Sequence, residues 1–203
     1  MENIILQTHG ISVKYGNFLA LDDINISLKN KHIYGFIGEN GAGKTTLMKV
    51  LTGLLYPTNG DFSLFGKNKP CDILKMRRHI GSTIEAPALY PEYSAYRNLE
   101  LQRILIGNPR LLILDEPING LDPKNISELR SLLKRLNEEN DVTLFLSSHI
   151  LNELYLLATD YYIIHKGRII KSITHDELDK KLSITGQSLE EYFLSITGGD
   201  SNV

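Results

Sequence analysis

The sequence predicts an α/β protein whose core is a mostly parallel sheet flanked by helices, with an antiparallel β layer beside it. Apolar strand-like runs alternate with amphipathic helical segments from residue 32 to residue 160, the order typical of parallel sheets. Strand-like segments stand before and after this region, and they indicate the antiparallel layer. The composition, 42% hydrophobic and 23% charged, is that of a chain able to bury a large core.

The elements of the N-terminal half follow from local patterns. The second strand is expected to be half-buried because Ile24, Ile26 and Leu28 alternate with polar residues. One helix carries apolar residues at helical spacing on a single face, namely Leu47, Val50, Leu51 and Leu54. The expected order is strand, strand, strand, helix, strand, strand, over residues 4–16, 20–30, 32–38, 44–55, 61–68 and 77–86.

The C-terminal half continues the alternation. A helix is expected from about Ser94, a plausible N-cap residue, and a terminal hairpin is expected to turn at Lys166–Gly167. A second amphipathic helix places Leu129, Leu132, Leu133 and Leu136 on its core face. After the helix at Ser94, the expected elements are strand, helix, strand, helix, hairpin, helix, helix, over 110–116, 125–140, 141–149, 150–158, 160–173, 174–182 and 188–197.

Charge and cysteine content exclude several classes. The chain has 22 basic and 24 acidic residues, so no nucleic-acid partner is expected, since such partners require clustered positive charge. The single cysteine, Cys71, excludes an intrachain disulfide and favours a reduced, cytosolic compartment. The N-terminus lacks the pattern of a signal peptide, and no apolar run approaches the roughly 20 residues that span a bilayer.

The stretch "GENGAGKTT" predicts a phosphate-binding loop. It fits G-x-x-x-x-G-K-[ST] and lies between an apolar strand and an amphipathic helix, the context that favours this motif over a chance glycine-rich turn. Gly41 and Gly43 allow positive φ and a close approach of the backbone to phosphate oxygens. Lys44 is expected to reach the β- and γ-phosphates, and the Thr45 hydroxyl to ligate Mg²⁺. The loop comprises Gly38, Glu39, Asn40, Gly41, Ala42, Gly43, Lys44, Thr45 and Thr46.

Three further segments offer polar groups to the same site. Asp115 and Glu116 end an apolar strand, where the first would serve Mg²⁺ and the second would orient or deprotonate an attacking water; alternatively, they cap the next turn. His149 ends another strand at the same rim, where it would bond a γ-phosphate oxygen or be structural. Tyr15 would stack on a base or be a half-buried strand residue.

The segments "VKYG", "GENGAGKTT", "IEAPALYP", "LLILDEPINGLDP" and "LFLSSHIL" together resemble the nucleotide-binding subunit of an ATP-binding-cassette (ABC) transporter, from residue 4 to about 175. The resemblance implies a P-loop NTPase, RecA-like fold over residues 1–175, with a helical extension and tail over 176–203. It implies Mg-ATP binding, with Tyr15 on adenine and Asp115 serving Mg²⁺. It also implies Glu116 as general base and His149 as the switch residue.

The same resemblance implies partners and a location. An integral-membrane permease and a second nucleotide-binding subunit are expected, with the chain peripheral at the cytoplasmic face of the membrane. Glu85 stands where the family usually has the Gln of the lid loop, which contacts Mg²⁺ and the membrane subunit. Asp122 falls in the dimer-contact loop, and Ile118 replaces a usual Thr. "IEAPALYP" and "SLEEYFLSIT" are similar to the subgroup that exports bacitracin and lantibiotics, often for self-protection.

One departure from the family pattern is large. The family places a helical subdomain before the acidic strand, with a signature of the type L-S-G-G-Q or S-x-G-M-x-Q-R, and the sequence contains neither. Only 29 residues separate Glu85 from Asp115, so the subdomain is expected to be truncated near residues 92–109, absent or reduced to one helix. The resemblance implies that the signature helix of one subunit holds the γ-phosphate bound to the other, through its N–H donors and positive dipole end. We therefore expect ATP binding with weak or absent turnover.

The sequence leaves several functions open. The leading one is the ATP-binding subunit of an exporter, coupling ATP hydrolysis to transport of a substrate such as an antibiotic peptide. The alternative is a degenerate cassette that binds ATP as a regulatory protein without efficient hydrolysis. A soluble cassette ATPase of translation or DNA repair is less favoured, because the chain lacks a basic surface or tandem arrangement. A nucleotide kinase would leave "DEPINGLDP" and "SSHIL" unexplained.

Overall fold

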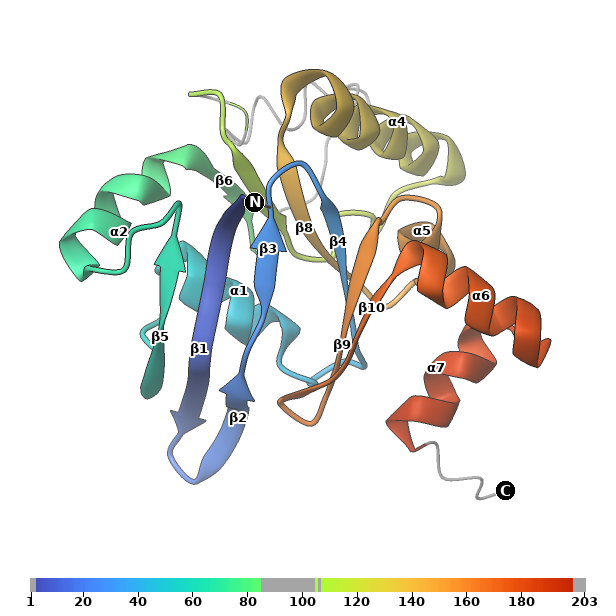
Figure 1. Cartoon of the computed structure of the whole chain (residues 1–203), viewed down its shortest axis with the longest axis horizontal. Coiled ribbons are helices and arrows are strands. Elements are labelled where there is room, and N and C mark those ends of the chain that lie inside the picture. Colours follow the sequence, from blue (N-terminus) through green and yellow to red (C-terminus); the bar gives the residue numbers. More distant parts are fainter. Residues whose placement is uncertain (1–2, 85–104, 106, 199–203) are drawn as a thin grey trace.

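The computed structural model describes residues 3–84, 105 and 107–198, and its first layer is an antiparallel sheet (Figure 1). The long strand β1 (Ile4–Tyr15) is its centre. It pairs with β2 (Phe18–Ile24) and β3 (Ser27–Lys29) along one edge and with β5 (Asn59–Leu64) along the other, always antiparallel. The expected antiparallel layer is thereby confirmed.

The second layer is a six-stranded sheet whose strands are β4 (Ile33–Ile37), β6 (Ile80–Thr83), β7 (Leu111–Leu114), β8 (Thr143–Ser148), β9 (Asp160–His165) and β10 (Arg168–Thr174). Their spatial order is β10-β9-β4-β8-β7-β6, and every pair is parallel except β9 with β10. Because β4, β8 and β7 are neighbours and parallel, their carboxyl ends meet at one edge. This edge is where ligands bind in open α/β sheets.

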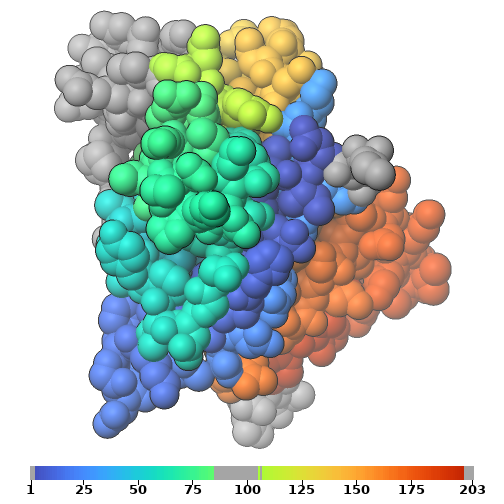
Figure 2. Space-filling view, turned by 60° about the vertical axis from the view of Figure 1, so that its left-hand side comes forward, coloured from blue at the N-terminus to red at the C-terminus, as the bar shows by residue number. Residues whose placement is uncertain are grey.

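Helices cover both faces of this sheet. The helix α1 (Lys44–Thr52) lies between the two sheets, whereas α4 (Pro123–Asn140), α5 (Leu151–Tyr155), α6 (His175–Thr185) and α7 (Leu189–Thr197) lie on the opposite face (Figure 1). The short helix α2 (Pro70–Met76) and a 3₁₀ turn (Arg77–His79) lead into β6. Figure 2 shows the surface of α2 and β5 running alongside β1. In the described part of the chain, no helix has the length and apolar character to span a membrane.

Alternating side chains of the buried strands divide the core in two. In β4, Tyr34 and Phe36 face the cluster around α1, whereas Ile33 and Ile37 face the cluster around α4 to α7. All five residues of β4 and all four of β7 are buried. This explains why both sequences read as continuous apolar runs: a parallel strand covered on both faces has no polar side.

Two expectations about the N-terminal half were wrong in detail. The strand expected over 20–30 is interrupted at Asn25–Ile26, where the Thr8 hydroxyl inserts between the strands, donating to Ile24 O at 2.9 Å and accepting from Ile26 N at 2.9 Å. The helix expected to reach residue 55 ends at Thr52, since Gly53 adopts φ 87° and its N–H closes onto Lys49 O. Leu54 therefore lies beyond the helix and is 69% exposed, not on its core face.

Two other differences concern topology. The C-terminal hairpin turns at Lys166–Gly167 as expected, with φ of 46° and 79°, but it extends the six-stranded sheet and does not join the antiparallel layer. The helix α2 was not anticipated, although Pro70 in its first turn is a typical helix-start signal. Glu85, most of the helix expected from Ser94, and the tail beyond Gly198 lie outside the described residues.

Candidate nucleotide-binding site

The phosphate loop connects the end of β4 to the start of α1. Gly41 and Gly43 have φ of 80° and 111°, so the left-handed conformations expected of these glycines are confirmed. A side chain on Gly43 would place its Cβ 2.7 Å from Leu21 Cδ2, whereas one on Gly41 would meet nothing within 4 Å. The helix α1 begins at Lys44, so its free N–H groups and its positive dipole end face the space in front of the loop.

Lys44 is curled back against the loop that it follows. Its Nζ donates to Gly38 O at 2.7 Å and to Glu39 O at 3.2 Å, and it lies 3.4 Å from Glu116 Oε1. The side chain is only 5% exposed. A buried ammonium must be paired, and here backbone carbonyls and one carboxylate share that role. The N–H groups of the Lys44 ammonium can donate to phosphate oxygens once the lysine releases these partners.

A short chain of hydroxyl and carboxylate groups joins α1, β7 and β8. Thr45 Oγ1 donates to Asp115 Oδ2 at 2.6 Å, and Ser147 Oγ donates to Asp115 Oδ1 at 2.5 Å. The serine oxygen also accepts from Glu116 N at 2.9 Å. Asp115 is 3% exposed and Ser147 fully buried. The structure thus brings together Thr45 and Asp115, as the sequence led us to expect, and adds Ser147 as the group that fixes both acids.

The hydroxyl of Thr45 and the carboxylate of Asp115 are suitable oxygen donors for Mg²⁺. No cluster of three or more His, Cys, Asp or Glu side chains suited to a metal ion occurs among the described residues. That finding does not conflict with a magnesium site here, because Mg²⁺ bound with nucleotides keeps water and phosphate oxygens as most of its ligands and takes few from the protein. Two converging oxygen groups are enough for this mode of binding.

Glu116 and His149 form a second pair at the sheet edge. The imidazole Nδ1 lies 2.8 Å from Glu116 Oε2, and the His149 N–H donates to the same oxygen at 3.3 Å. The other oxygen, Oε1, is buried, has no hydrogen-bond partner among the described residues, and lies 3.4 Å from the Lys44 ammonium. Glu116 has φ 49°, a conformation that costs a non-glycine residue roughly 1 kcal/mol or more. The backbone therefore holds an unsatisfied carboxylate oxygen toward the phosphate loop.

A cavity of about 300 Å³ opens in front of the loop. Its walls include Lys44, Thr45 and Glu116 at one end, and Tyr15 and Phe18 at the other. The two aromatic residues are register partners at the tip of the β1–β2 hairpin and are 49% and 63% exposed. An anion-binding end joined to an exposed aromatic end matches a nucleotide in size and chemistry.

The sequence identified most of these side chains but missed two. Phe18 lies in the cavity wall together with the expected Tyr15. Its position three residues after Tyr15, in a tight hairpin, is the sequence feature that could have indicated this. Ser147 has no motif of its own; only its position two residues before His149 places it on the strand that enters the site. Glu85, the remaining expected ligand, is outside the described residues.

The two-layered sheet, the strand–loop–helix around Lys44 and the acidic strand end define a P-loop nucleotide-binding protein. The family model described as ABC transporter matches residues 21–98, and a model of AAA domains matches residues 94–154. The chain is 35% identical to the bacitracin transport ATP-binding protein BcrA of Bacillus licheniformis, covering 87% of this chain and 72% of BcrA. It is 33% identical to the lantibiotic transport ATP-binding protein SrtF of Streptococcus pyogenes, covering 93% and 96%.

Solved structures agree with the sequence comparisons. The ATP-binding subunit of an ABC transporter superposes with a TM-score of 0.76 at 26% identity, covering 95% of this chain and 99% of that one. A dimeric ATP-binding cassette in a post-hydrolysis state bound to ADP and Pi superposes with a TM-score of 0.72 at 19% identity, which shows a shared fold; the overlap covers 84% of this chain and 99% of the other. The chain belongs to the ABC transporter family and is an ATP-binding subunit of that family of ATPases. This membership favours a transporter subunit over the degenerate cassette.

Proposed function

We propose that this chain binds Mg-ATP in the cavity in front of the phosphate loop and uses ATP hydrolysis to energise export through a separate membrane permease. The observation that carries this proposal is the convergence of Lys44, Thr45 and Glu116 in the cavity wall, with Asp115 hydrogen-bonded to Thr45. The aromatic end supports the same assignment, because Tyr15 and Phe18 offer a stacking surface for the base.

The proposed chemistry follows from the unliganded contacts. Lys44 would leave the Gly38 and Glu39 carbonyls and take phosphate oxygens in their place, which keeps its ammonium paired. Mg²⁺ held by Thr45 and Asp115 would neutralise charge on the β- and γ-phosphates. With Lys44 withdrawn, Glu116 Oε1 becomes a free acceptor for a proton of the attacking water, while His149 holds the other oxygen in place.

The segment before β7 bears on how fast the chain turns over. The match to BcrA extends over 220 residues, whereas this chain has only 203, so the alignment includes positions at which BcrA has residues and this chain has none. This supports the proposal that the helical subdomain carrying the signature is shortened here. In a head-to-tail dimer of two such chains, neither γ-phosphate would be held by a signature helix. We therefore expect ATP to bind but to be hydrolysed slowly.

The transported molecule and the location are proposed from the relatives. BcrA and SrtF are named for bacitracin and lantibiotic transport, so we propose a peptide antibiotic as substrate, exported for self-protection. We propose that a permease holds the chain at the cytoplasmic face of the membrane and that a second nucleotide-binding subunit completes the ATP site. Glu85 is proposed to contribute to the permease contact and to Mg²⁺.

The test is nucleotide binding and turnover on the purified chain, alone and reconstituted with its membrane subunit. We expect saturable Mg-ATP binding in both cases and hydrolysis that rises in the reconstituted complex. Glu116→Gln should retain binding and lose turnover, while Glu138→Gln, the same change at an exposed position on α4, should change neither binding nor turnover. Wild-type turnover in Glu116→Gln would refute the assignment of the base, and absent ATP binding would refute the function itself.

A further inference from the structure

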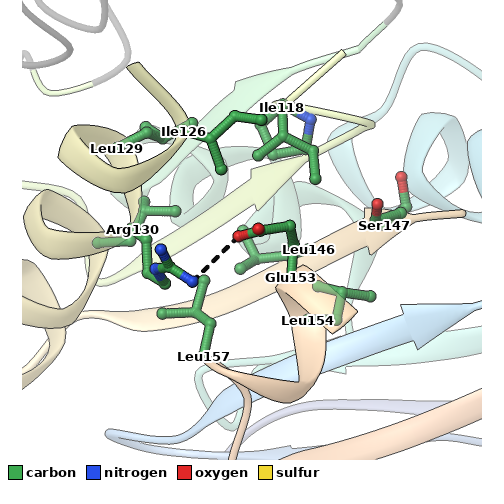
Figure 3. A pocket seen from close by; sticks show the side chains of 12 residues that line it. Ile118, Ile126, Leu129, Arg130, Leu146, Ser147, Glu153, Leu154 and Leu157 are labelled. Carbon is green, nitrogen blue, oxygen red and sulfur yellow. Dashed lines mark ion pairs between the residues drawn. The ribbon is translucent and has the colours of Figure 1, made fainter. Parts of the chain in front are cut away.

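A small cavity separates α4 from α5 directly behind the catalytic edge of the sheet (Figure 3). Its walls are almost entirely apolar, from Ile126, Leu129 and Leu133 on the α4 side and Leu146, Leu154 and Leu157 on the other. A volume of about 20 Å³ holds no ligand larger than one water molecule. The cavity is therefore a gap in the packing between two helices, not a binding site.

The helix α5 is tied to α7 and α6 by Asn152, which donates to Glu190 Oε1, and by Tyr155, which donates to Asp179, whereas its α4 side faces the gap. It spans five residues, its N-cap residue Ile150 makes no side-chain cap, and Leu154 is its one buried residue. A helix this short is unstable in isolation, so its position depends on tertiary contacts. The apolar gap weakens those contacts on the α4 side. His149 lies two residues before the helix, so any displacement of α5 reaches the imidazole.

One polar contact crosses the rim of the gap. Arg130 Nη1 of α4 lies 3.2 Å from Glu153 Oε2 of α5, and Figure 3 shows the two side chains meeting over the cavity. Both side chains are about three-quarters buried, at 25% and 26% exposed. Water screens such a pair less than one on the open surface, so its electrostatic attraction is stronger than that of an exposed pair.

We propose that Arg130 and Glu153 are positioning residues that fix the Glu116–His149 pair. The chain leaves Glu116, passes through Pro117–Leu121 and enters α4, whose N-cap Asp122 accepts from Asn125 N at 2.9 Å. It leaves His149 and enters α5. The segments that lead into the two helices are thus joined by Glu116–His149, and the helices themselves are joined across the rim of the cavity by Arg130–Glu153. Loss of the second contact lets α5 tilt and pulls the imidazole from the carboxylate.

The inference rests on the proposed roles of Glu116 and His149, and it predicts a specific kinetic pattern. Arg130→Met and Glu153→Gln should lower kcat about 10-fold, because small misplacements of catalytic groups cost about that much or more. The dissociation constant for Mg-ATP should stay unchanged, since neither residue lines the nucleotide cavity. The charge-swapped double variant Arg130→Glu with Glu153→Arg should recover most of the rate, because it restores the pair across the gap.

The experiment compares these variants with Lys31→Met, which breaks the Lys31–Asp141 ion pair of 2.8 Å at the opposite edge of the sheet. Turnover is measured on the complex with the membrane subunit, and the ring NMR signal of His149, assigned with His149→Gln, is recorded on the chain alone. We expect a shifted or broadened signal in Arg130→Met and an unchanged one in Lys31→Met. Rates and signals equal to those of Lys31→Met, or a double variant no better than the singles, would overturn the inference.

The two readouts separate this inference from the proposed function. If Glu116→Gln keeps the wild-type rate, the assignment of Glu116 as base fails. If the wild-type complex shows no turnover, the proposed hydrolysis fails, and the His149 signal in Arg130→Met alone then decides whether the ion pair positions the imidazole.

Discussion

Substitution of Ser147 by Ala should be unusually costly for the removal of one hydroxyl group. The Ser147 hydroxyl donates to the Asp115 carboxylate at 2.5 Å and accepts from the Glu116 N–H at 2.9 Å, and the residue is fully buried. Loss of a hydrogen bond to a buried charge costs about 2 kcal/mol, and loss of the neutral bond about 1 kcal/mol more. We expect Ser147→Ala to lower the free energy of unfolding by about 3 kcal/mol, or Tm by about 9 °C for a chain of this size.

The neighbouring serine provides the matched control. Ser148 is equally buried, but within the described residues its hydroxyl makes a single hydrogen bond, accepted from Ile150 N at 2.9 Å. Ser148→Ala should therefore cost about 1 kcal/mol. Urea and thermal denaturation of both variants, without nucleotide, measure the difference directly. A loss in Ser147→Ala no larger than in Ser148→Ala would refute the reasoning that this hydroxyl holds the two acids. The same variant should also bind Mg-ATP less tightly, because Asp115 loses the group that orients it.

Three further predictions concern the nucleotide cavity. Lys44→Ala should weaken Mg-ATP binding at least about 10-fold in calorimetry, since it removes an ammonium in the cavity wall and with it a charged hydrogen bond of about 2 kcal/mol; unchanged affinity would contradict the site. Phe18→Ala should weaken ATP and GTP alike by about 1 kcal/mol, because stacking does not distinguish bases, and a loss confined to ATP would argue against stacking. Gly43→Ala should destabilise the chain more than Gly41→Ala in denaturation, as only the former meets Leu21 and Ala20 O within 3 Å; equal losses would show that backbone strain alone matters.

The phosphate loop illustrates what local sequence can predict. Its glycine conformations, its place between a strand and a helix, and the position of Lys44 at the start of α1 all depend on neighbours within a few residues. The buried strands β4 and β7 could also be predicted from the sequence, because a strand covered on both faces needs a continuous apolar run. Leu54 was misjudged since the helical spacing continues past Gly53, whose left-handed conformation ends the helix.

Contacts between distant segments were harder to predict. The break between β2 and β3 is made by Thr8, sixteen residues away from the carbonyl that it bonds. The sequence pattern of the C-terminal hairpin does not indicate which sheet the hairpin joins. The parallel pairing of β9 with β4 places it in the six-stranded sheet. Phe18 falls between the two strands expected from the sequence, and only the folded β1–β2 hairpin places it in one wall of the nucleotide cavity.

The sequence by itself determined the α/β class, the phosphate loop and the identity of the acids and histidine at the strand ends, because motif and strand periodicity are short-range properties. Only the tertiary structure decided that Ser147 joins Asp115 to Glu116, that one oxygen of Glu116 lies beside Lys44 without a hydrogen bond from the described part of the chain, and that Arg130 meets Glu153 across a gap behind the site. These contacts depend on which strands become neighbours and how helices cross them, and that order is set by packing of the whole chain.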